Sequence, residues 1–106
     1  MRFAIAIVFA ATSLAPAAPV SFNRDIQPIL ANHCYQCHGP DSKQRKAGLR
    51  LDQEGNSRAE LKSGARAVVP GDLEESELVY RITTNDEDDR MPPVDFNKRL
   101  SKAQID

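Results

Sequence analysis

The chain is organised around the stretch His33-Cys34-Tyr35-Gln36-Cys37-His38-Gly39. In it, two cysteines separated by two residues are followed at once by a histidine, a spacing typical of c-type haem attachment. Each thiol can form a thioether with one of the two haem vinyl groups, and the histidine then lies beneath the iron as its proximal ligand. The whole chain has only two cysteines and two histidines, so their clustering indicates a shared site. We expect Cys34, Cys37 and His38 to bind one covalent haem c.

Three other interpretations of this stretch are open. A zinc site needs about four ligands, and besides the two cysteines and His38 only the neighbouring His33 remains. A redox dithiol usually follows a strand in a βαβ unit, and the sequence shows no such pattern. A structural disulfide between Cys34 and Cys37 would leave His38 without a role. The spacing therefore favours haem over all three.

The N-terminus has the pattern of an export signal. Arg2 provides a positive charge, residues 3–11 form an apolar run, and Ala15-Pro16-Ala17 fits the small-residue cleavage pattern. We predict a signal peptide over residues 1–17 and one domain over residues 18–106, exported to the periplasm or cell-envelope space. The alternative is an uncleaved N-terminal anchor, although the apolar run is shorter than the roughly 20 residues of a membrane span.

The composition of the remaining domain suggests a thin hydrophobic core. It has no Trp, and its only aromatic residues are Phe22, Tyr35, Tyr80 and Phe96. A small domain of this kind often needs a cofactor to complete its core, and a tethered haem would supply that apolar surface.

The charge of the chain gives limited information about partners. The net charge is −1 and no basic patch dominates, so we expect no nucleic-acid partner. Residues 43–66 are mainly basic and residues 72–89 mainly acidic. This asymmetry could orient a redox partner, but an ordinary solvated surface is the favoured explanation.

Apolar spacing and turn residues predict a mainly helical domain. A first helix is expected over residues 20–32, with Pro28 requiring its regular part to begin near Asp25. Further helices are expected over residues 57–63 and 72–83, the latter opened by a capping box, and from Ser101 onward. Residues 47–52 alternate between apolar and polar side chains, which predicts a short extended segment crossing the haem face. A backbone carbonyl of residues 47–49 is a candidate acceptor for the His38 ring.

A second haem ligand is predicted in Arg90-Met91-Pro92-Pro93. Methionine is the usual distal ligand of cytochromes c, and Met91 is the only methionine left once Met1 departs with the signal. The two prolines restrict the backbone around it, as a loop that presents a ligand requires. His33 cannot readily compete, because it adjoins Cys34. The acidic residues 85–89 could suggest calcium, but they lack the spacing of an EF-hand loop.

Several landmarks occur in a fixed order along the chain: residues 22–30, 34–41, 48–52, 69–72, 76–79 and 90–93. Taken together they resemble the planctomycete-type cytochrome c domain. The resemblance implies an all-α, class I-like cytochrome c fold, with His38 and Met91 as axial ligands of the iron and Cys34 and Cys37 as thioether sites. It also implies a redox partner protein, or further domains of a longer exported chain. Because the sequence ends where the family's C-terminal helix would continue, we expect that helix to be truncated.

The leading functional hypothesis is a mono-haem electron-transfer module rather than an enzyme, with no catalytic residue assigned. One alternative is a haem-based sensor or a small peroxidase-like enzyme, which would need an open sixth position on the iron. Another is a regulatory or structural module of a larger exported enzyme, in which haem serves mainly to fold the domain.

Overall fold

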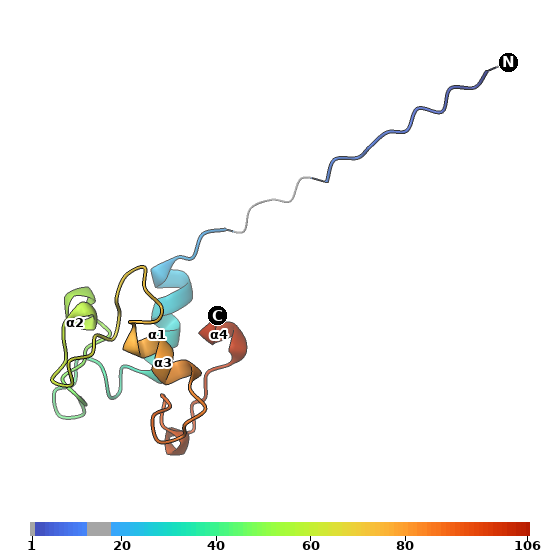
Figure 1. Cartoon of the computed structure of the whole chain (residues 1–106). Helices are drawn as coiled ribbons and strands as arrows, with labels where there is room; N and C mark the ends of the chain where they lie inside the picture. The colour runs from blue at the N-terminus through green and yellow to red at the C-terminus, as the bar shows by residue number, and fades with distance from the viewer. Residues whose placement is uncertain (1, 13–17) are drawn as a thin grey trace.

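A computed structural model describes residues 2–12 and 18–106. Residues 2–12 are exposed and form no regular secondary structure, and the helical part begins at Phe22 (Figure 1). Met1 and the predicted cleavage motif at residues 15–17 lie outside the described residues. Among the helices of the described segments, none combines the length and the apolar character needed to cross a membrane.

The first predicted helix is present and has two parts. A π-helical turn, η1 (Phe22–Ile26), leads directly into α1 (Gln27–His33). Pro28 lies in the first turn of α1, where its missing N–H is tolerated. A proline ring also crowds the carbonyl four residues earlier, which is consistent with the wider π turn just ahead of it. The regular helix therefore begins close to the predicted Asp25 and ends directly at the Cys34 motif.

The second helix differs from its prediction. Instead of residues 57–63, α2 covers Glu54–Arg58, and the backbone is already in an extended conformation at Ala59. The following residues turn back on themselves, because Leu61 N–H donates to the Ala65 carbonyl at 2.8 Å and Glu60 pairs with Arg66 in an isolated antiparallel bridge. These contacts form a tight turn that ends the helix before Gly64, which lies in that turn with φ of 86°.

The third helix ends at the predicted residue but begins later. Asp72 Oδ1 accepts a hydrogen bond from Glu75 N–H at 3.1 Å, as a cap would, yet α3 covers only Glu77–Thr83. Buried Ser76 explains the delay. Its hydroxyl donates to the Asp72 carbonyl at 2.7 Å and accepts from Val69 N–H at 2.8 Å, so residues 72–75 form a separate turn.

The predicted extended segment alternates in burial without joining a sheet. Leu49 and Leu51 are buried, whereas Arg50 and Asp52 between and after them form an ion pair at 2.6 Å. The described segments contain no β-strand, only isolated bridges. The architecture is therefore helices joined by long coils.

The core is as thin as the composition predicts. The buried apolar residues of the described segments are Leu49, Leu51 and Ala67, and partly buried side chains from α1 and α3 pack against them. In Figure 1, α1 and α3 lie at the centre of the helical part, with α2 on one side.

After α3 the chain passes through the 3₁₀ turn η2 (Val94–Phe96) to α4 (Lys102–Ile105), which opens with the expected cap at Ser101.

Candidate functional site

The end of α1 places the cysteine motif. Cys34 N–H still bonds to the Leu30 carbonyl at 2.8 Å, and the backbone then tightens so that Cys37 and His38 N–H both donate to the Cys34 carbonyl, at 3.2 and 2.8 Å. The motif is therefore a compact turn that continues the helix. This turn brings Cys34, Cys37 and His38 to the wall of one cavity.

The loop of residues 46–51 supports the His38 ring from the side. The His38 ring contacts the Lys46 carbonyl through Nδ1 at 3.2 Å, which is one residue before the stretch predicted to supply this acceptor. Lys46 N–H donates to the Cys37 carbonyl at 2.7 Å, and Leu51 N–H donates to the His38 carbonyl at 2.8 Å. The two ends of the loop, Lys46 and Leu51, are thus both hydrogen-bonded to the backbone of the motif.

Burial and the bond to Lys46 act in opposite directions on the protonation of His38. Burial lowers the pKa of the imidazole, and the bond to the Lys46 carbonyl only partly offsets that effect. A neutral ring that donates from Nδ1 leaves Nε2 with a free lone pair, which is the state that a metal ligand needs.

Cys34 and Cys37 are not bridged to each other and differ in environment. Burial raises the pKa of the Cys34 thiol to about 11, so this thiol is protonated near neutral pH. Cys34 also packs against the hydrophobic core, whereas the core contacts do not include Cys37. Cys34 therefore contacts the hydrophobic core and also lines the cavity.

Residues 91–93 of the predicted distal segment line the same cavity, and the segment is bonded to α3. Met91 N–H donates to the Arg81 carbonyl at 2.8 Å, and the Met91–Pro92 peptide bond is cis. Two residues earlier, the Asp89 carboxylate accepts a hydrogen bond from Tyr80 at 2.8 Å and lies 3.5 Å from Arg81. The Met91 loop is therefore bonded to α3 through backbone and side chain.

The cavity that joins these elements has a volume of about 180 Å³. Most of its wall is apolar, which suits a large flat macrocycle that is held by thioethers and shielded from water. All four predicted site residues contribute to it, and their ligand roles stay predictions. The full lining is His33, Cys34, Cys37, His38, Lys46, Leu49, Leu51, Leu78, Arg81, Ile82, Met91, Pro92, Pro93 and Phe96.

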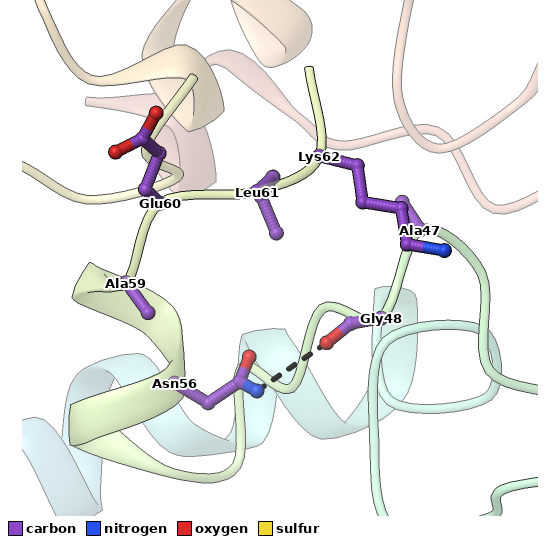
Figure 2. Close-up of a pocket in the computed structure, with 7 residues that line it drawn as sticks. All are labelled: Ala47, Gly48, Asn56, Ala59, Glu60, Leu61 and Lys62. Carbon is purple, nitrogen blue, oxygen red and sulfur yellow. Dashed lines mark hydrogen bonds between the residues drawn. The ribbon is translucent and has the colours of Figure 1, made fainter. Parts of the chain in front are cut away.

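Some residues at this site were not assigned a role from the sequence. His33 is buried, with its Nδ1 2.9 Å from the Ile29 carbonyl, and Phe96 adds an aromatic side of the cavity from η2. Asn56 on α2 contacts the loop that supports His38 (Figure 2). The position of His33 beside Cys34 is a usable signal for its location, whereas nothing in the local sequence indicates Phe96 or Asn56.

The alternative of a zinc site would require about four converging ligands. In the parts of the chain that the structure describes, His, Cys, Asp and Glu form no group of three or more that could hold a metal ion.

Comparisons with known proteins give one match. A family model described as planctomycete cytochrome C matches residues 34–95, a span that begins at the first cysteine of the motif and ends past the Met91 loop. No curated protein and no solved structure matches the chain.

Proposed function

The chain belongs to the planctomycete cytochrome C family, and on that premise we propose that it is an exported electron carrier with one covalent haem c. Such cytochromes are typically electron carriers rather than enzymes. The observation that carries the proposal is the meeting of Cys34, Cys37, His38 and Met91 at one apolar cavity. The haem, when bound, supplies a single iron that gains and loses one electron.

Each of these residues has a distinct task in the proposal. Cys34 and Cys37 would tether the macrocycle, and the compact turn between them would fix the spacing of the two bonds. His38 would bind the iron through Nε2, with its orientation held by the Lys46 carbonyl. Met91 would supply a thioether sulfur to the same iron, a ligand that raises the reduction potential compared with a second histidine.

The rest of the chain would keep the site rigid and partly dry. Leu49, Leu51 and Leu78 cover the interior of the cavity. Backbone bonds to the Cys37, His38 and Arg81 carbonyls hold both ligand-bearing segments. A site that is held in this way changes little between oxidation states, which favours fast electron transfer over substrate chemistry.

The N-terminal pattern supports export. A positive residue, an apolar run and a small-residue cleavage pattern make residues 1–17 a signal peptide in this proposal, followed by a class I-like haem domain over residues 18–106. Partners would be a redox protein or further domains of a longer exported chain.

Covalent haem attachment is tested by co-expression with haem-attachment machinery. The purified protein should show the haem mass adduct and a pyridine haemochrome spectrum typical of two thioether bonds. The variant with Cys34→Ala and Cys37→Ala should lack both signals. Wild-type protein without the mass adduct under these conditions would refute the proposal.

The carrier function is tested at Met91. Oxidised wild-type protein should be six-coordinate and low-spin, because His38 and Met91 would both bind the iron. Met91→Ala should be high-spin and should bind carbon monoxide readily in the ferrous state. A wild-type haem that is already five-coordinate and binds carbon monoxide quickly would instead favour the sensor or peroxidase-like alternative.

A further inference from the structure

The loop that supports His38 has an unfavourable backbone conformation. Ala47 and Gly48 lie consecutively in the left-handed region, with φ of 56° and 66°. This region is easy for glycine, whereas alanine at positive φ is strained. The strained residue directly follows Lys46, whose carbonyl contacts the His38 ring. Other contacts must therefore hold the loop in place.

Asn56 provides contacts on both sides of this loop. Its Oδ1 accepts a hydrogen bond from Arg50 N–H at 2.6 Å, and its Nδ2 donates to the Gly48 carbonyl at 3.3 Å. Figure 2 shows the Asn56 amide directed from α2 toward Gly48, across a cavity that Ala47 also lines. The turn has one backbone hydrogen bond, from Leu49 N–H to the Lys46 carbonyl at 3.2 Å. The half-buried Asn56 side chain adds bonds to the two backbone groups on either side of Leu49, the Gly48 carbonyl and the Arg50 N–H.

We propose that Asn56 is a positioning residue for the proximal haem ligand. By holding residues 48–50 it keeps the Lys46 carbonyl against His38 Nδ1, and so it sets the electron donation of the imidazole to the iron. The inference rests on the proposed haem function. Asn56 itself contributes no atom to the wall of the haem cavity.

The expected direction follows from ligand chemistry. A carbonyl that accepts the Nδ1 proton makes the imidazole a stronger electron donor, which stabilises the ferric state. If the loop relaxes and this bond weakens, the ferric state loses stabilisation relative to the ferrous state. The reduction potential of the haem then rises.

The test uses the haem-loaded protein and the Asn56→Ala variant. We expect an upward shift of the midpoint potential in a redox titration. We also expect several-fold faster solvent exchange of the His38 Nδ1 proton, measured by NMR in the ferrous state, because the bond that protects it has weakened. The axial ligands should remain His and Met by absorption spectroscopy.

Ser57→Ala is the matched control. The Ser57 hydroxyl donates to the Glu54 carbonyl at 2.7 Å within the same helix and makes no bond to the loop. This variant should lower the thermal midpoint while leaving the potential and the proton exchange unchanged. Equal shifts in both variants would show that Asn56 matters only for the stability of α2, and would overturn the proposal.

A milder variant applies if Asn56→Ala fails to load haem. Asn56→Asp retains an acceptor for Arg50 N–H, removes the donor to the Gly48 carbonyl and adds a negative charge, so the readout for this variant is proton exchange and not the potential. Faster exchange of the His38 Nδ1 proton is again expected, and exchange at the wild-type rate would overturn the proposal. Failure of haem attachment in the wild type would instead refute the proposed function, so the two failures are distinguishable.

Discussion

At the scale of single residues, Gly39 is required by the tight turn that follows His38. It is buried, and a Cβ added there would overlap the backbone carbonyl of Tyr35. Backbone cannot move aside as a flexible side chain can, so Gly39→Ala must open the turn next to the proximal ligand. We expect a loss of about 1–3 kcal/mol in the free energy of unfolding, as is typical of overpacking. Chemical denaturation of the haem-loaded protein measures it.

Gly55 offers the matched control for this prediction. It lies within α2, and an added Cβ would meet open space. Gly55→Ala should stabilise the protein by roughly 0.5–1 kcal/mol, because alanine favours a helix over the unfolded chain. Two substitutions of the same chemistry should therefore have opposite signs. If Gly39→Ala is also neutral or stabilising, the turn is looser than its contacts indicate.

At the scale of elements, the contact between α3 and the distal loop should govern how firmly Met91 is held. Asp89 is the side-chain part of this contact, since Tyr80 and Arg81 both bind its carboxylate. In Asp89→Ala we expect external imidazole to displace Met91 about two- to fivefold more easily, the range typical of an exposed charged pair. Absorbance titration of the ferric protein with imidazole measures this change.

Asp88→Ala controls for charge in the same loop. It removes an exposed carboxylate one residue away from the contact with α3. Imidazole binding should stay at the wild-type level in this variant. Similar weakening in both variants would mean that the overall charge of the loop, rather than the bond to Tyr80 and Arg81, determines access to the iron.

The elements also show what the sequence could and could not predict. The first helix and its end at Cys34 follow from local apolar spacing and from Pro28, so local rules were sufficient there. The end of α2 depends on contacts of residues 60 and 61 with residues 65 and 66, and the start of α3 depends on the bond between Ser76 and Val69. Hydrophobic periodicity carries no information about such bonds.

The meeting of the candidate ligands at one cavity was more predictable than the helices around them, because these residues form a contiguous motif and a lone methionine. The carbonyl partner of His38 was placed one residue too late, since the left-handed turn at Ala47 and Gly48 shifts which carbonyl faces the ring. Nothing in the spacing of residues 47–52 reveals that turn. Asn56 was missed for the same reason, because its role exists only once α2 packs beside the loop.

At the scale of the whole molecule, the domain is built around a cavity rather than around a solid core. Only Leu49, Leu51 and Ala67 are buried apolar residues in the described part of the chain, and both leucines also line the cavity. A domain of this size with so little apolar burial has scarcely enough stabilisation to offset its loss of conformational entropy. The haem should therefore be a structural component of the fold.

This view predicts a large difference between the haem-loaded and haem-free proteins. The loaded protein should unfold cooperatively on heating, whereas the variant with Cys34→Ala and Cys37→Ala should show a broad transition at much lower temperature and little near-ultraviolet circular dichroism. Far- and near-ultraviolet melts of both proteins measure this. Because the two substitutions themselves remove buried sulfur at Cys34, wild-type chain expressed without haem-attachment machinery and kept reduced is the necessary second sample. If that sample melts as sharply and at the same temperature as the loaded protein, the three buried residues suffice for folding and the cofactor serves redox chemistry alone.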